Sequence, residues 1–124
     1  MTTKSLQGQT AGRGARRIIF MTSGQFCAPM RGTIAYASTK GALDAFTVTF
    51  AAETGHLGIT VNAVDPVPTD SGWMNEKTRA ELAPRFGLGR IGQLADAANL
   101  VGFLASPQAD WITGQVLHSR GGFV

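Results

Sequence analysis

A tyrosine and a lysine stand four residues apart, at Tyr36 and Lys40, within a segment rich in helix-forming residues. At this spacing both side chains lie on one face of a helix, about one turn apart. A tyrosine hydroxyl with an ordinary pKa of about 10 exchanges protons poorly at neutral pH. A neighbouring ammonium group lowers that pKa because its charge favours the phenolate. The pair therefore predicts a general acid or base.

The elements that must position this pair alternate between strands and helices. Residues 16–23 form an apolar run ending in small polar residues, which is typical of a strand buried on both faces of a parallel sheet. Ser23 then falls at the carboxyl end of that strand. Glycine and proline indicate a loop over 24–33, and helical spacing of apolar residues predicts a helix over 34 to about 56. β-branched residues predict a second strand over 59–64.

The second half of the chain continues the alternation. Residues 70–86 are polar and predict one or two short exposed helices, whereas 93–105 carry one apolar stripe and predict a longer helix. A third strand is expected over 115–118. The order indicates an α/β fold with a three-stranded parallel sheet and right-handed crossovers, as in one half of a doubly wound Rossmann-type domain. Ligands bind beyond the carboxyl ends of such strands, where Ser23 and residues 66–71 fall.

Several motifs in combination resemble the short-chain dehydrogenase/reductase family. Tyr36 opens the run Tyr-Ala-Ser-Thr-Lys-Gly-Ala, it follows Ser23 by thirteen residues, and the next strand reads Val-Asn-Ala-Val-Asp-Pro. The resemblance covers about residues 16–124 and is strongest to ketoacyl-carrier-protein-reductase-like members. It implies that Ser23 hydrogen-bonds the substrate oxygen and that Tyr36 transfers the proton. It also implies that Lys40 lowers the tyrosine pKa and holds the nicotinamide ribose, in an enzyme that uses NAD or NADP.

The segment that follows the second strand resembles the family's Pro-Gly-x-x-x-Thr sequence, which contacts the nicotinamide amide. Val67 departs from that pattern, because a β-branched residue replaces the glycine and is costly wherever the backbone needs a positive φ. Arg120 departs as well, since the family often has an acidic residue before its final glycine pair. The resemblance implies cofactor contacts from Tyr36, Lys40, Pro66, Val67, Thr69 and Ser71.

The family's N-terminal dinucleotide-binding half, with its glycine-rich phosphate turn, has no counterpart in the sequence. Residues 87–92 do spell Gly-x-Gly-x-x-Gly, but no buried strand precedes them, so they are expected to form a connecting loop. The expected fold is therefore a partial doubly wound sheet. Three hypotheses follow: an oxidoreductase acting on a carbonyl or a secondary alcohol, a truncated inactive fragment or partner-binding module, or a chain completed by a complementing N-terminal half or an upstream start.

Composition limits the remaining classes of function. With 124 residues, 44% hydrophobic and 15% charged, the sequence predicts one soluble globular domain over 16–124. No apolar run approaches the roughly 20 residues that cross a bilayer, so no membrane contact is expected. The basic start, residues 1–15, has no acidic residue, no aromatic residue and no amphipathic period. It is expected to be a flexible tail rather than a nucleic-acid arm or a transit peptide.

Cysteine and histidine are scarce in the sequence. One cysteine and two isolated histidines predict no internal disulfide and no metal site, and they favour a reducing cytoplasm. The expected partners are a small carbonyl or alcohol substrate and the nicotinamide cofactor, with a second copy of the chain as a further candidate. The sequence does not distinguish NAD from NADP, nor does it name the substrate.

Overall fold

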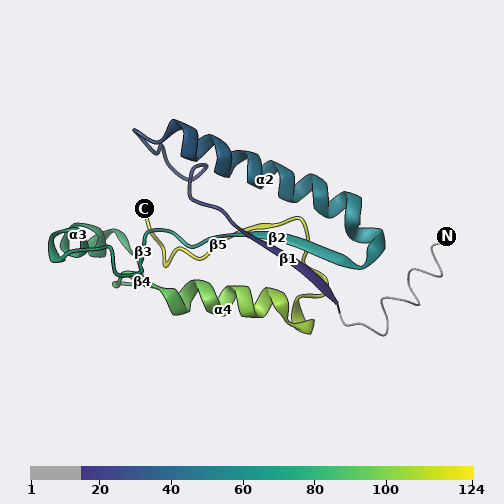
Figure 1. Ribbon diagram of the computed structural model, residues 1–124. Coiled ribbons are helices and arrows are strands. Elements are labelled where there is room, and N and C mark those ends of the chain that lie inside the picture. The colour runs from purple at the N-terminus through teal and green to yellow at the C-terminus, as the bar shows by residue number, and fades with distance from the viewer. Residues whose placement is uncertain (1–14) are drawn as a thin grey trace.

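A three-stranded parallel sheet lies between two long helices in the computed structural model, which describes residues 15–124 (Figure 1). The strands are ordered β1-β2-β5, with α2 on one face of the sheet and α4 on the other. This arrangement confirms the predicted fold class. The bounds of these elements are β1 Arg16–Met21, α2 Ile34–Thr54, β2 Ile59–Asp65, α4 Leu94–Ala105 and β5 Val116–His118. The predicted tail over residues 1–15 falls almost wholly outside the described residues.

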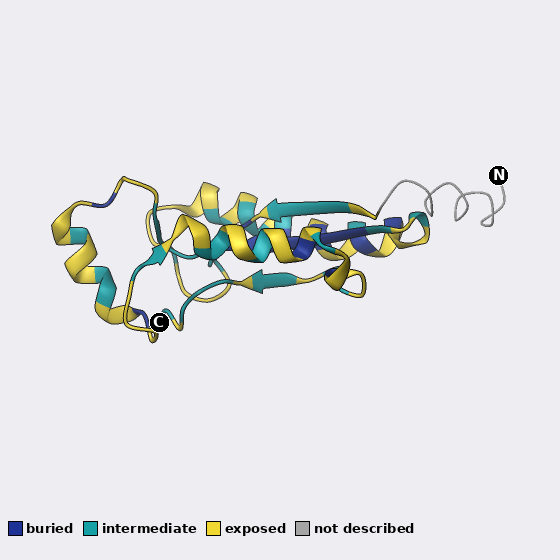
Figure 2. Cartoon of the chain, turned by 90° about the horizontal axis from the view of Figure 1, so that it is seen from below, coloured by how far each residue is buried: buried dark blue, intermediate teal, exposed yellow. Residues whose placement is uncertain are grey.

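Strand β2 is the shared member of the sheet. It pairs with β1 from Arg16 opposite Ile59 to Met21 opposite Val64. On its other side, its last three residues pair with β5, ending with Asp65 opposite His118. Every residue of β2 after the first is buried, and the buried residues in Figure 2 gather where β2 runs. A strand covered on both faces and paired on both edges is apolar for most of its length.

Strand β1 differs from its predicted environment. Its apolar run indicated burial on both faces, but its inner residues are half-buried and its two ends, Arg16 and Met21, are exposed. The reason is its position, because β1 lies at the edge of the sheet and is paired with β2 alone. Among the described residues, β1 therefore has one unpaired edge.

The core fills the space between the sheet and α4. Val64, Leu104 and Ala109 are fully buried there, and half-buried apolar residues from both layers pack around them. Helix α2 covers the opposite face, where Phe46 packs edge-on against Phe20 of β1. Burial of these side chains on both faces holds the two helices on the sheet.

Shorter elements connect the second half of the sheet. These are the helix α3 (Glu76–Leu82) and two short 3-10 turns, Ala83–Arg85 and Pro107–Ala109; a third turn, Gly55–Leu57, joins α2 to β2. The sequence did not predict the two-residue parallel pair between β3 (Thr69–Asp70) and β4 (Gly92–Gln93). Residues 87–91 form a loop, as expected from the lack of a preceding strand. No helix in the described part of the chain is both long and apolar enough to cross a membrane.

Helix α4 begins with a capping box. The Asp96 carboxylate accepts a hydrogen bond from the Gln93 backbone N–H at 2.8 Å, and it receives two hydrogen bonds of 2.7 Å from the Arg90 guanidinium. The hydrogen bonds from Arg90 are the main reason that the pKa of Asp96 lies well below its usual range. A carboxylate in the first turn also suits the positive end of the helix dipole, so the start of α4 is well defined.

Asn62 links β2 to the segment before β5 and provides a test of the fold. Its amide donates to the Ile112 carbonyl at 2.9 Å, and its carbonyl accepts from the Gln115 N–H at 3.1 Å, with only 1% of the residue exposed. We expect Asn62→Ala to lower the free energy of unfolding by about 2–3 kcal/mol, because both backbone groups lose a buried partner. Urea unfolding measures the change. The exposed Gln108→Ala is the control, and equal effects of the two substitutions would contradict this role.

Candidate functional site

A cavity of about 500 Å³ opens at the carboxyl end of the sheet. It brings together four of the residues that sequence analysis proposed, Ser23, Tyr36, Val67 and Thr69. Ser23 comes from the turn after β1, Tyr36 from the first turn of α2, and the other two from the segment after β2. The remaining candidates Lys40, Pro66 and Ser71 do not line this cavity.

Lys40 lies one helical turn beyond Tyr36 and is held by the end of β1. Its Nζ donates a hydrogen bond of 2.8 Å to the Met21 carbonyl, and the same atom lies 5.7 Å from the centre of the Tyr36 ring. The predicted pair therefore shares one helix face, with the ammonium group near the phenol. The Tyr36 side chain faces the cavity while the residue stays 47% exposed, so solvent reaches the phenol.

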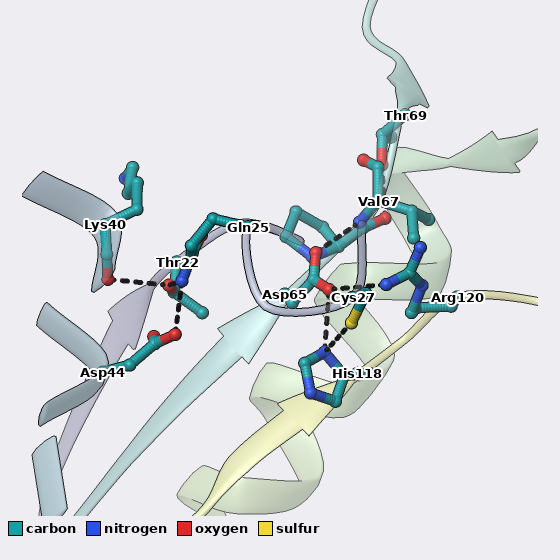
Figure 3. Close-up of polar contacts among 11 residues, drawn as sticks. Thr22, Gln25, Cys27, Lys40, Asp44, Asp65, Val67, Thr69, His118 and Arg120 are labelled. Carbon is teal, nitrogen blue, oxygen red and sulfur yellow. Dashed lines mark hydrogen bonds and ion pairs between the residues drawn. The ribbon is translucent and has the colours of Figure 1, made fainter. Parts of the chain in front are cut away.

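A small polar network fixes the turn that carries Ser23 against helix α2 (Figure 3). Thr22 is buried and donates from its hydroxyl to the Lys40 carbonyl at 3.4 Å. Gln25 donates to the carboxylate of Asp44, which is buried on the inner face of α2. These contacts anchor the chain on both sides of Ser23, so its position relative to Tyr36 is set by the packing of the turn on the helix.

The segment after β2 has the strained backbone that the sequence anticipated. Val67 has φ of 57° and is the one non-glycine residue with positive φ in the described part of the chain. Its N–H donates to Asp65 Oδ1 at 3.0 Å, which holds the turn. The Thr69 hydroxyl donates to the carbonyls of Pro66 and Val67, at 2.9 and 3.1 Å. A β-branched residue is unfavourable in this region, so these hydrogen bonds hold a conformation that favours glycine.

Asp65 connects this segment to the end of β5 and was not proposed as a site residue. It is fully buried, its Oδ2 lies 2.8 Å from His118 Nδ1, and Cys27 Sγ lies 3.8 Å from the same nitrogen. Figure 3 shows the three side chains meeting beside Arg120. Cys27 and His118 are 91 residues apart. Only the prediction that all strands end at one rim could have suggested their proximity.

The charged side chains of the cavity are both arginines. Arg120 Nη1 lies 3.7 Å from Asp65 Oδ2, beyond hydrogen-bond distance, and its Nε and Nη1 are buried without a hydrogen-bond partner. Arg85 donates to the Val124 carbonyl at 2.7 Å and lies over the Phe123 ring. Asp70 lies outside the cavity lining, and the hydrogen bond from Arg79 lowers its pKa. The charged side chains that line the cavity are therefore positive, and the buried Asp65 carboxylate lies beside one of them.

Comparison with known proteins identifies the family. Residues 2–124 match the family model described as enoyl-(acyl carrier protein) reductase. The chain belongs to the short-chain dehydrogenase/reductase family. It is 57% identical over 108 residues to the uncharacterized oxidoreductase YjdA of Bacillus subtilis, a match that covers 87% of this chain and 43% of the relative. It is 41% identical over 96 residues to the 3-oxoacyl-acyl-carrier-protein reductase FabG of Rickettsia felis, covering 75% and 40%.

Solved structures agree with this assignment. The promiscuous reductase LugOII, described as catalysing a keto-reduction in lugdunomycin biosynthesis, has a TM-score of 0.79 and 31% identity over 97% of this chain and 49% of its own. The angucycline C-6 ketoreductase LanV, solved with bound NADP, has a TM-score of 0.79 at 30% identity with the same coverage. The chain thus spans about half the length, or less, of these relatives.

The Val67 backbone offers a test of strain at the site. We expect Val67→Gly to raise the free energy of unfolding by about 0.5–2 kcal/mol. Relief of a strained positive φ contributes about 1–3 kcal/mol, and the extra backbone freedom of glycine in the unfolded chain offsets about 0.5–1 kcal/mol.

Val48→Gly on the exposed face of α2 is the matched control, and it should lower stability by about 0.5 kcal/mol because glycine disfavours helix more than valine does. Urea unfolding of both variants measures the difference. A loss of stability in Val67→Gly equal to that in Val48→Gly would contradict strain at Val67.

Proposed function

We propose that this chain provides the proton-transfer site of an NAD(P)-dependent oxidoreductase that reduces a carbonyl or oxidises a secondary alcohol. The observation that carries the proposal is the meeting of Ser23 and Tyr36 on one cavity, with the Lys40 ammonium group 5.7 Å from the tyrosine ring. The reductases and oxidoreductases among the relatives support the same reaction class. A reducing cytoplasm is the proposed location.

Each residue has a distinct part in this proposal. The Ser23 hydroxyl hydrogen-bonds the substrate oxygen and orients it toward Tyr36. The Tyr36 hydroxyl donates the proton during reduction and accepts it during oxidation. Lys40 places its positive charge beside the phenol, and its hydrogen bond to the Met21 carbonyl keeps the ammonium there.

A nicotinamide cofactor fits part of the site. When bound, the nicotinamide supplies or accepts the hydride. The residues that would hold it are Val67 and Thr69 on the cavity wall and Lys40 beside it, together with Tyr36 and the more distant Pro66 and Ser71. The Val67 side chain occupies space that the glycine of the family pattern leaves open, so it narrows the space through which the nicotinamide would reach this backbone. No glycine-rich turn joins a buried strand to a helix among residues 15–124, so the phosphates have no matching cradle there.

We infer further that the substrate carries a negative charge. Arg85 and Arg120 face the cavity, and no carboxylate does so. Arg120 lines the cavity, and a charge-assisted hydrogen bond from its guanidinium to a carboxylate or phosphate of the substrate would be stronger there than in water. An oxoacid fits this charge better than the corresponding neutral ester.

A second candidate function is that of a partner-binding module without activity of its own. The observation in its favour is that β1 is paired on one side only, so its open edge can accept another strand. The share of the relatives' length that the chain covers is consistent with either candidate. Cofactor binding separates the two.

Tyr36→Phe tests the proposed reaction. The purified chain should bind NADPH or NADH in calorimetry and oxidise it in the presence of a keto substrate. The variant should lose about 10²- to 10⁴-fold in kcat, because it removes the proton donor, with its cofactor affinity retained. Ser38→Ala, an exposed substitution on the same helix, is the control. If the chain binds neither cofactor and associates with itself or with another protein, the partner-binding function replaces the enzymatic one.

The proposed charge of the substrate is tested with the pair acetoacetate and ethyl acetoacetate. We expect Arg120→Gln to lower the ratio of kcat/KM for the acid to that for the ester by tenfold or more, since a charge-assisted hydrogen bond contributes about 1.5–3 kcal/mol. Arg31→Gln removes the same charge from an exposed loop outside the cavity and is the control. Equal ratios in the two variants would contradict the role of Arg120.

A further inference from the structure

Three potential metal ligands meet beside the cavity although they are far apart in the sequence. Cys27 lies in the turn after β1, Asp65 is the last residue of β2, and His118 is the last residue of β5. All three strands run parallel and end at one rim, so the topology of the sheet collects these side chains. Their spacing along the chain forms no metal-binding motif, which explains why the sequence alone predicts no metal site.

The distances among the donor atoms suit one ion. Cys27 Sγ, His118 Nδ1 and an Asp65 carboxylate oxygen all lie within 4.8 Å of one another. Bonds of about 2.0–2.3 Å from a central zinc ion reach donor atoms that are about 3–4.6 Å apart. The measured separations are 3.8 Å from sulfur to nitrogen and 2.8 Å from nitrogen to oxygen. Small side-chain shifts are therefore enough to place the three atoms around one ion.

The direction of these contacts distinguishes a metal site from a catalytic relay. In a cysteine–histidine–aspartate relay the thiol and the carboxylate contact opposite nitrogens of the imidazole ring. Here Cys27 and Asp65 both approach Nδ1 of His118. The three side chains converge on a common point instead of forming a line, which is the arrangement of ligands around an ion.

The donor set indicates the class of metal. A thiolate and an imidazole favour zinc and similar divalent transition ions over calcium and magnesium, which take oxygen ligands. We propose that Cys27, Asp65 and His118 bind Zn²⁺ or a related divalent transition ion. Cys27 and His118 are exposed, so solvent can occupy the fourth position, as in zinc sites with three protein ligands.

Arg120, 3.7 Å from Asp65 Oδ2, opposes a cation at this position, whereas release of the Cys27 thiol proton favours one. Asp65 Oδ1 accepts from the Val67 N–H, and Arg120 is near enough to offset the charge of the carboxylate but not to hydrogen-bond its Oδ2. Binding releases the thiol proton of Cys27 to solvent and requires the His118 proton to reside on Nε2. The thiolate and the carboxylate then neutralise the two charges of the ion, while Arg120 remains as an outer positive charge.

Binding would have a structural consequence at the proposed reaction site. The ion would join the turn that follows Ser23 to the residue that precedes Pro66 and Val67. Both walls of the cavity would then be fixed to the end of β5. Metal binding does not depend on the proposed oxidoreductase activity, because none of the three ligands lines the cavity.

Cobalt is the probe for the test, because a thiolate bound to Co²⁺ gives a charge-transfer band in the near ultraviolet. The full chain, without an affinity tag and in reduced form, is titrated with Co²⁺ and then with Zn²⁺. We expect one equivalent of Co²⁺ to produce the band and Zn²⁺ to abolish it. Cys27→Ser should eliminate the band. His118→Gln should weaken Co²⁺ binding at least 10- to 100-fold, which is the loss of affinity when a residue that only hydrogen-bonds a metal ligand is removed.

The other histidine provides the matched control. His56 is exposed at the end of α2, away from the three ligands, so His56→Gln should bind Co²⁺ as the unaltered chain does. Cys27 is exposed, so Cys27→Ser should leave the thermal unfolding curve of the metal-free chain unchanged. His118→Gln removes the imidazole that faces the buried Asp65, so it should lower the midpoint while the transition stays cooperative. The proposal is overturned if no thiolate band appears, or if His118→Gln and His56→Gln have the same affinity for Co²⁺.

Discussion

Parallel pairing on both edges of β2 is the constraint on which the rest of the structure depends. The strand is buried along six of its seven residues, and it carries the polar groups that fix its neighbours. Asn62 in its middle ties it to the segment before β5, and Asp65 at its end holds the Val67 turn and faces His118. Most buried polar groups in folded proteins are hydrogen-bonded. The polar residues of β2 therefore specify one register and one arrangement of the loops at its end.

The order of elements could be predicted from the sequence because each has a strong local signal. The alanine-rich stretch and its apolar spacing predicted α2, and the β-branched run predicted β2, with bounds within one or two residues of those observed. The strain at Val67 was also predictable, because a single residue type conflicted with the backbone that the motif requires. Local propensity and motif thus determine these features without knowledge of the tertiary structure.

Other features could not be read from local sequence. The apolar run of β1 predicts a strand but not its place in the sheet, so its burial was overestimated. The sequence marks Arg120 as a departure from the family pattern but does not place it, whereas the fold turns it into the cavity beside Gly24 and Asp65. The meeting of Cys27 with His118 depends on the pairing of distant strands. Each of these outcomes is set by contacts between residues that lie far apart in the chain.

The hydrogen bond from Lys40 to the last carbonyl of β1 makes the position of the lysine ammonium depend on how β1 is aligned with β2. Successive residues of a strand place their side chains on opposite faces, so a slip of β1 by one residue along β2 would exchange the faces of its side chains and move the Met21 carbonyl away from Lys40. The ammonium would lose its anchor, and Phe20 would lose its contact with Phe46 of α2. The position of the Lys40 ammonium beside Tyr36 therefore depends on the register of β1 on β2.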